Sequence, residues 1–277
     1  LAFCNAGFSL FPDNLVAVTA REDILSTIAA LIFLGGIGFP VLAEIGRKLL
    51  GPGHRFSVHA RLALYTSLFL IVGGTLVLGL TQTLGTAYEP AHRWLASFFH
   101  AVSSRTAGFN SDDLALWSAP SQIFLLFLMV VGGSPMSCAG GIKTVTFALL
   151  LFILLCRLQR KDHLELGKRT IPARLVTYTV VVFTFYLGTL FLGTWFLTMT
   201  EPAATGFLPL AFEASSALGT VGLSLGVTPT LTAGGKIILI ILMLIGRLGP
   251  LTLLSILPAQ KTTPHYRYPD EDQLIVG

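Results

Sequence analysis

Three glycine-centred segments recur along the sequence, and such segments are suited to binding a cation through backbone carbonyl oxygens. They read Cys4-Asn5-Ala6-Gly7-Phe8-Ser9, Arg105-Thr106-Ala107-Gly108-Phe109-Asn110 and Gly219-Thr220-Val221-Gly222-Leu223-Ser224. Glycine adopts backbone conformations that aim carbonyls inward at little steric cost. Rings of carbonyls replace the hydration shell of K⁺ in channel filters built on TVGYG loops, whose first three residues match Thr220-Val221-Gly222. One glycine after a helix is usually only a cap, but three copies indicate an ion pathway.

The elements around these segments repeat as well. Short helix candidates near 90–104 and 205–218 precede the second and third segments, and an apolar stretch follows each segment. Neither short helix reaches the roughly 20 residues that a membrane span needs. Because irregular backbone at membrane depth is tolerated only where protein or a water-filled cavity supplies partners, this order of span, short helix, glycine turn and span predicts ion permeation.

The composition excludes an ordinary soluble protein. Of 277 residues, 53% are hydrophobic and 12% charged, and the mean hydropathy is +0.76. The charged share is about half that of a soluble domain. Membrane spans are predicted near 24–46, 60–81, 120–156, 174–199 and 235–258. We therefore expect an all-α polytopic membrane protein whose repeated units surround a central pore.

The distribution of charge predicts the orientation in the membrane. Basic residues follow the first and third spans and the last span, which predicts that these segments are cytoplasmic. They are Arg47, Lys48, Arg55, Arg61, Arg157, Arg160, Lys161, Lys168, Arg169, Arg174, Lys261 and Arg267. The opposite face holds mostly acidic residues, with Arg21, Arg93, Arg105 and Lys236 as its cations. The acidic face is either a vestibule that attracts cations or an ordinary solvated rim, and the net charge of +4 reflects topology rather than nucleic-acid binding.

The third span contains a break. As one helix its apolar run would measure about 54 Å, far beyond one bilayer. Glycines and a proline interrupt the run between Gly132 and Lys143 and are incompatible with a stable helix. The break is either a helix kink, a loop between two spans, or a functional loop inside the membrane.

Arg247 lies near the middle of the last apolar span. An arginine at a helix centre costs about 2.5–3.5 kcal/mol on insertion scales, so it should face the protein interior or water. It is either a structural anchor or a positive charge on the pore side that restrains the broken segment. Lys143 is either a second cation near the cavity or an ammonium group that extends toward the interface from the end of the broken segment, and the second interpretation is favoured.

Catalytic and metal-binding patterns are missing from the sequence. Cys4, Cys138 and Cys156 are odd in number and have no CxxC spacing, and the histidines lack metal-ligand spacing. We therefore expect no enzyme, no cofactor and no metal other than the transported ion. The alternative is an ion-coupled secondary carrier of a small organic solute, which predicts inverted halves rather than three units of the same sense.

The repeated unit, with one glycine per filter, resembles the Trk/Ktr/HKT superfamily of potassium transporters, most closely the Ktr membrane subunit. In that family one chain holds four such units around one pore. The resemblance implies the end of the second repeat at 1–56, the third repeat at 57–168, the fourth repeat at 169–258 and a cytoplasmic tail at 259–277, with the N-terminal part missing. The implied filter residues are Asn5, Ala6, Gly7, Thr106, Ala107, Gly108, Thr220, Val221 and Gly222.

The same resemblance implies the gate, the partners and the cellular location. The segment 132–143 looks like the family's gating loop, and the implied gating residues are Gly132, Gly133, Ser134, Pro135, Gly140, Gly141, Lys143 and Arg247. The implied function is K⁺ uptake through a channel-like pore, with Na⁺ as activator or coupling ion. The implied partners are the lipid bilayer, a second copy in a homodimer and a cytoplasmic ring of nucleotide-binding RCK subunits. The implied location is a bacterial cytoplasmic membrane, with multiple passes and a cytoplasmic C-terminus.

Overall fold

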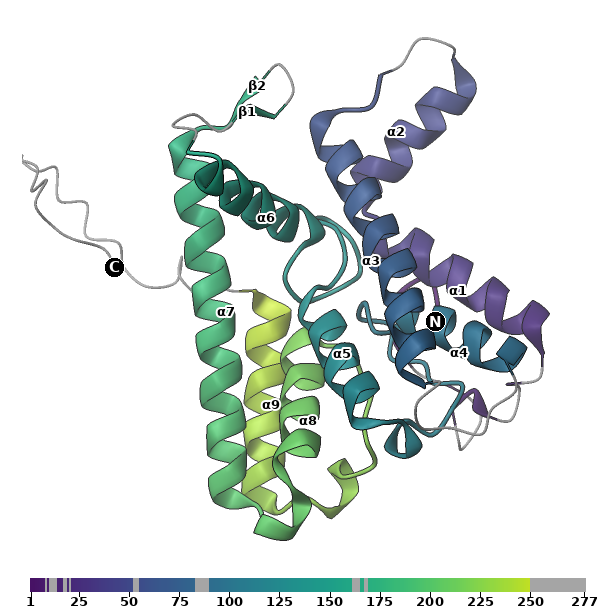
Figure 1. The fold of residues 1–277 in the computed structure, drawn as a ribbon, viewed down its shortest axis with the longest axis vertical. Coiled ribbons are helices and arrows are strands. Elements are labelled where there is room, and N and C mark those ends of the chain that lie inside the picture. Colours follow the sequence, from purple (N-terminus) through teal and green to yellow (C-terminus); the bar gives the residue numbers. More distant parts are fainter. Residues whose placement is uncertain are drawn as a thin grey trace, which may run out of the picture.

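The computed structural model describes residues 1–7, 9, 14–16, 19, 21–51, 55–82, 90–160, 165–166 and 169–249. Its regular structure is almost entirely helical (Figure 1). The helices are α1 (Glu22–Gly36), α2 (Phe39–Leu50), α3 (Val58–Gln82), α4 (Pro90–Ser103), α5 (Ala119–Val130), α6 (Thr144–Leu158), α7 (Ala173–Thr200), α8 (Phe207–Gly219) and α9 (Ala233–Leu248). Short 3-10 turns lie at Leu114–Leu116, Ala203–Thr205 and Thr228–Thr230. The predicted all-α class is confirmed, with a single small antiparallel hairpin of β1 (Glu165–Leu166) and β2 (Arg169–Thr170) in the described part of the basic loop.

Two of the described helices, α3 and α7, are each long and apolar enough to cross a membrane. With 25 and 28 residues they match the predicted spans at 60–81 and 174–199. The bent pair of α1 and α2 would make a third span, whereas α5 and α6 are apolar but shorter. Helix α9 begins near the start of the predicted span at 235–258. The end of that span and the predicted tail at 259–277 lie outside the described residues.

The surfaces of α3 and α7 are rich in exposed apolar side chains. Tyr65 and Phe69 on α3 and Phe191 and Trp195 on α7 are all exposed. A contiguous apolar surface of this kind marks contact with a membrane or another protein. It fits the predicted contact with a lipid bilayer.

The first predicted span, 24–46, is not one unbroken helix. Helices α1 and α2 meet at 104° across a break after Gly36. Gly38 has a φ of +94°, and Pro40 lies in the first turn of α2. Glycine takes this left-handed conformation without a steric cost, and proline at the start of a helix cannot continue a preceding one. The structure therefore corrects the prediction of a continuous span.

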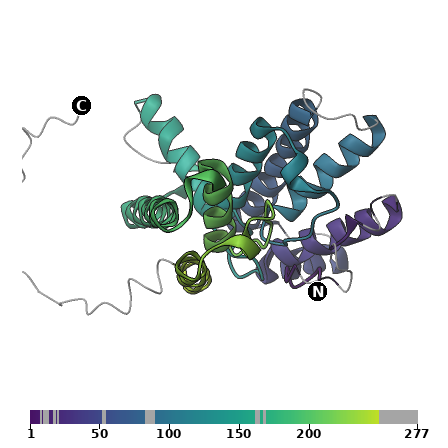
Figure 2. The ribbon, with the colours of Figure 1, turned by 90° about the horizontal axis from the view of Figure 1, so that it is seen from below.

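Both predicted short helices are present as α4 and α8. Helix α4 packs against α3 and α1, whereas α8 packs against α5, α7 and α9. Every residue of α8 from Leu210 to Gly219 is buried. In Figures 1 and 2, α7–α9 lie on one side of the molecule and α1–α4 on the other. The short helices thus run inside the protein, as their irregular ends require.

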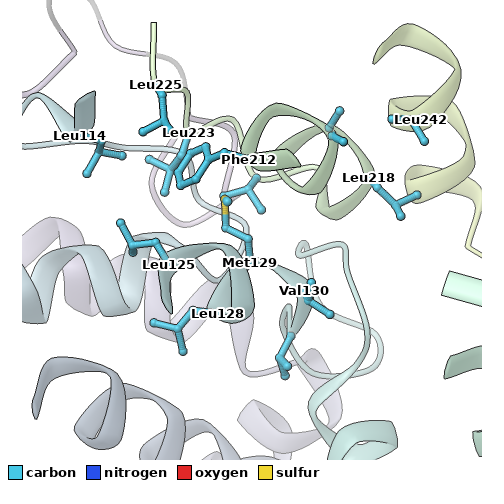
Figure 3. Close-up of a cluster of buried hydrophobic side chains, with 14 of the residues drawn as sticks. Leu114, Leu125, Leu128, Met129, Val130, Phe212, Leu218, Leu223, Leu225 and Leu242 are labelled. Carbon is cyan, nitrogen blue, oxygen red and sulfur yellow. The ribbon is translucent and has the colours of Figure 1, made fainter. Parts of the chain in front are cut away.

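A hydrophobic core holds α8 in place. Figure 3 shows Leu125 and Met129 of α5 beside Phe212 of α8, together with Leu223 and Leu225 from the chain that follows α8. Lipid tails are as apolar as leucine, so this core is stabilised by close packing more than by transfer from water. It fixes the end of α8, where Thr220 begins the third glycine-centred segment.

Candidate ion pathway

The three glycine-centred segments share one backbone conformation. Each segment contains three residues that end in its glycine, and we call these the triplets: Asn5-Ala6-Gly7, Thr106-Ala107-Gly108 and Thr220-Val221-Gly222. The first and third residues of each triplet have positive φ: Asn5 (49°) and Gly7 (68°), Thr106 (72°) and Gly108 (75°), and Thr220 (52°) and Gly222 (95°). The middle residues Ala6, Ala107 and Val221 do not. Positive φ is uncommon outside glycine, above all for a β-branched threonine. Three occurrences of the same strained pattern mark three copies of one structural unit.

The three triplets also meet in space. A Cβ atom on Gly7 would lie 2.9 Å from the carbonyl oxygen of Ala107. One on Gly108 would lie 2.3 Å from the carbonyl oxygen of Val221, and one on Gly222 would lie 3.5 Å from the Cα of Gly108. The second triplet therefore lies between the first and the third, although the glycines are far apart in sequence. The approaches at Gly7 and Gly108 leave no room for a side chain at the third position of these triplets.

Hydrogen bonds join α4 and α8 to the triplets. The Ala107 N–H donates to the Ser103 carbonyl at 2.9 Å, and the Val221 N–H donates to the Ser216 carbonyl at 2.8 Å. The Gly222 N–H donates to Ser216 Oγ at 3.1 Å. The C-terminus of a helix carries a partial negative charge. Both short helices therefore direct negative potential at the triplets, which suits a cation.

The predicted break in the third span is present between α5 and α6, and its ends are held together. The Gly132 N–H donates to the Ile142 carbonyl at 3.0 Å, and the Ile142 N–H donates to the Val130 carbonyl at 3.1 Å. The hydroxyl groups of Ser134 and Thr144 are 2.9 Å apart. The segment is thus a closed loop rather than a helix kink, and we call Gly132–Lys143 the glycine-rich loop.

The glycine-rich loop touches two of the triplets directly. The Gly140 N–H donates to Thr106 Oγ1 at 3.2 Å. A Cβ atom on Gly140 would lie only 2.1 Å from Thr220 Oγ1. The loop therefore covers the threonine ends of the second and third triplets, and its position and theirs are coupled.

The other side of the glycine-rich loop rests on the break between α1 and α2. The Ser134 N–H donates to the Gly36 carbonyl at 2.9 Å, and the Phe39 N–H donates to the Met136 carbonyl at 3.1 Å. Gly38 approaches the loop so closely that a Cβ atom would lie 2.6 Å from the Pro135 carbonyl oxygen. The helix break thus exposes backbone groups that the loop satisfies, which explains why the first span bends.

Lys143 and Arg247 both donate hydrogen bonds to carbonyls of the glycine-rich loop. Lys143 Nζ lies 2.6 Å from the Ala139 oxygen, and Arg247 Nη1 lies 3.4 Å from the Cys138 oxygen. No carboxylate lies within 4.0 Å of either cation in the described part of the chain. The Lys143 ammonium therefore turns back onto the loop, which corrects the interpretation that it extends toward the membrane interface.

The structure corrects the predicted position of Arg105. Predicted among the charges of the acidic face, it is instead buried next to the second triplet. Its Nη2 lies 3.0 Å from Ser67 Oγ and 3.3 Å from the Gly132 carbonyl oxygen. Arg105 thus links α3, the triplet at Thr106 and the start of the glycine-rich loop. The position of Arg105 directly before Thr106 is the sequence signal that indicates its place beside the triplet.

Two cavities border this arrangement. One of about 560 Å³ is lined by Gly7, Val221 and Gly222 and, farther along, by Glu213 and Arg247. The other, of about 220 Å³, lies behind the glycine-rich loop and is lined by residues that include Gly140, Lys143, Tyr186 and Arg247. The first cavity joins the triplets to Arg247 along one continuous space.

Comparisons with known proteins identify the family. The family model described as TrkH, cation transport protein, matches residues 2–266. The Ktr system potassium uptake protein B of Vibrio alginolyticus is 35% identical over all of this chain and 61% of its own length. Its counterpart in Bacillus subtilis is 39% identical over 97% of this chain and 60% of its own length. The chain thus spans about 60% of these relatives.

The fold agrees with the sequence comparison. The crystal structure of the potassium transporter TrkH from Vibrio parahaemolyticus matches with a TM-score of 0.77 and 22% identity, over 93% of this chain and 56% of that one. The family and the relatives are transporters, which confirms the prediction that this protein is not an enzyme. The resemblance found in the glycine segments is confirmed as well: the chain belongs to the TrkH family of cation transport proteins.

Proposed function

We propose that this chain forms part of a K⁺ uptake pathway across a bacterial cytoplasmic membrane, with its three triplets as three walls of a selectivity filter. The observation that carries the proposal is that the triplets share one strained backbone conformation and meet at their glycines. Carbonyls held in this way can replace the hydration shell of K⁺. The two relatives at 35% and 39% identity are named for potassium uptake, which supports K⁺ as the substrate.

We further propose that the glycine-rich loop is the gate of this pathway. It contacts the threonines at one end of the triplets through Gly140, and Lys143 and Arg247 bind its carbonyls. A loop in this position blocks the path when it lies against the triplets and opens it when it withdraws. Two cations bound to the loop make its position sensitive to the charge in the neighbouring cavities.

Regulation and assembly belong to the same proposal. We propose Na⁺ as an activating or coupling ion, a homodimer as the assembled form and a ring of cytoplasmic nucleotide-binding subunits as the regulator. The basic segment that begins with Arg157 at the end of α6 and continues with Arg160 would face either that ring or lipid headgroups on the cytoplasmic side. The C-terminus would lie on the same side.

The test of this function is K⁺ uptake by the full-length protein that carries this sequence. The host is a strain without its own K⁺ uptake systems, grown in low K⁺ with and without added Na⁺. We expect growth and saturable K⁺ uptake that rises when Na⁺ is present. Membranes that contain the protein but show no K⁺ uptake above the empty host would refute the proposal.

Arg247 provides a first prediction about gating. Replacement by alanine removes the bond to the Cys138 carbonyl and one of the two cations that hold the glycine-rich loop. We expect Arg247→Ala to change the maximal K⁺ flux by a few fold, since a long hydrogen bond on an exposed side chain lies at the lower end of the about 0.5–1.5 kcal/mol that a typical hydrogen bond contributes. Arg247→Lys keeps the charge, and its maximal K⁺ flux should lie between that of the wild type and that of Arg247→Ala. Uptake kinetics equal to wild type at equal membrane content would rule out a gating role.

A further inference from the structure

Glu213 is a buried carboxylate beside the third triplet. It lies on α8, is 4% exposed and borders the cavity that Gly7, Val221 and Gly222 also line. Burial of an ionised carboxylate is costly unless hydrogen bonds or a countercharge compensate for the lost water. The groups that contact the Glu213 carboxylate therefore indicate its role.

The hydrogen bonds of Glu213 all go to the chain that follows the triplet. Ser224 Oγ donates to Oε1 at 2.5 Å, and the Leu225 N–H donates to the same oxygen at 3.2 Å. Thr228 Oγ1 donates to Oε2 at 2.6 Å. Three donors around two oxygens fit an ionised carboxylate, which only accepts. Glu213 thus ties the segment after Gly222 to the helix before Thr220.

Among the residues that the structure describes, Glu213 has no ion pair. No Lys, Arg or His nitrogen of the described residues lies within 4.0 Å of its carboxylate. By contrast, the loop after the second triplet carries Asp112, whose carboxylate lies 3.1 Å from His92 Nε2 and 4.0 Å from His100 Nδ1. The charge of Glu213 therefore acts on the adjacent cavity, which Arg247 also lines without pairing with it.

The fold itself does not require a carboxylate at this position. When Thr106 is aligned with Thr220, Glu213 corresponds to Phe99 of the preceding repeat. Phe99 is completely buried and apolar, and its helix α4 still ends at a triplet of the same conformation. A costly charge where the sister repeat uses phenylalanine points to a role in function.

We propose that Glu213 is a specificity-determining residue of the ion pathway. Its hydrogen bonds fix the segment Ser224–Thr228 behind the third triplet, and its charge raises the local concentration of K⁺ in the cavity that the first and third triplets border. The inference rests on the proposed function and deepens it, because it assigns part of the K⁺ affinity to one side chain outside the triplets.

The two contributions are separated by two substitutions in the full-length protein. Glu213→Gln keeps the length and most hydrogen bonds but removes the charge. We expect the KM for K⁺ to rise about tenfold, at the lower end of the effect of charge on cation concentration in clefts. Glu213→Asp keeps the charge, but its side chain is one methylene shorter and its carboxylate no longer reaches Ser224, Leu225 and Thr228 as Glu213 does. We expect a lower K⁺-over-Na⁺ uptake ratio and a smaller change in KM than in Glu213→Gln.

Glu201 supplies a matched control. It is also buried, its carboxylate also binds a threonine through Thr232 Oγ1 at 2.6 Å, and no cation neutralises it in the described residues. It binds Thr232, the N-cap residue of α9, rather than the chain beside a triplet, so Glu201→Gln should leave the KM and the ion ratio unchanged. KM and ion ratio do not depend on the amount of protein, so reduced expression does not mimic the effect.

The outcomes distinguish this inference from the function on which it rests. If the wild-type protein takes up K⁺ and Glu213→Gln has the wild-type KM and ion ratio, the role of Glu213 is refuted and the pathway stands. An equal rise in KM for Glu201→Gln would likewise refute it, because a general effect of buried charge would then suffice. Absence of K⁺ uptake by the wild type refutes the proposed function itself.

Discussion

Gly108→Ala is expected to weaken selective K⁺ uptake at least tenfold. The new Cβ atom would lie 2.3 Å from the carbonyl oxygen of Val221, at a residue whose φ is +75°. A left-handed backbone costs alanine about 1–2 kcal/mol, and overpacking adds about 1–3 kcal/mol. Since about 1.4 kcal/mol is a factor of ten in affinity, we expect at least a tenfold weaker response to K⁺. The measurement is K⁺ uptake and the K⁺-over-Na⁺ ratio in the full-length protein.

The other triplet glycines and one helix glycine provide a graded control. An added Cβ atom on Gly7 would lie 2.9 Å from a carbonyl oxygen, and one on Gly222 would lie 3.5 Å from its nearest neighbour. The loss of K⁺ uptake should therefore be greatest for Gly108→Ala, smaller for Gly7→Ala and smallest for Gly222→Ala. Gly73 on α3 has no atom within 4 Å of its added Cβ atom, and Gly73→Ala should behave as wild type. Normal uptake by Gly108→Ala at wild-type membrane content would show that the triplets do not form the ion path.

Much of this architecture could be predicted because its signals are local. The short helices α4 and α8 followed from apolar stretches too short to span a membrane, and each is followed at once by a glycine triplet. The glycine-rich loop followed from the break in an overlong apolar run. In each case the residues that carry the signal are the residues that adopt the structure.

The features that the sequence did not reveal depend on distant contacts. The run from Gly35 to Pro40 reads as part of an apolar span. Gly38 and Pro40 permit a break there, but the carbonyls at the end of α1 are satisfied by hydrogen bonds from the glycine-rich loop about 100 residues later. Likewise Arg105 looked like a charge of the acidic face, whereas Ser67 and Gly132 supply its partners inside the protein. Local patterns cannot show which distant backbone groups satisfy one another.

The contact between the glycine-rich loop and the triplets leads to the second large prediction. Gly140 is the residue at which the loop meets Thr106 and Thr220, and its added Cβ atom would lie 2.1 Å from Thr220 Oγ1 and 2.7 Å from the Gly219 carbonyl oxygen. Gly219 is the last residue of α8, whose residues from Leu210 to Gly219 are buried, and Thr220 follows it directly. In Gly140→Ala the loop, rather than the helix, must therefore move.

We expect Gly140→Ala to hold the glycine-rich loop away from the triplets, so that K⁺ flux is several-fold higher and depends less on regulation. A second substitution tests the cause. Thr220→Ser removes the branching methyl group, so the hydroxyl that the new Cβ atom meets can take another rotamer, and Gly140→Ala/Thr220→Ser should move back toward wild-type flux. Gly188→Ala on α7, where an added Cβ atom meets nothing within 4 Å, is the neutral control. If Gly140→Ala instead lowers the flux at equal membrane content, the loop opens the path when it touches the triplets, and its role as a block is wrong.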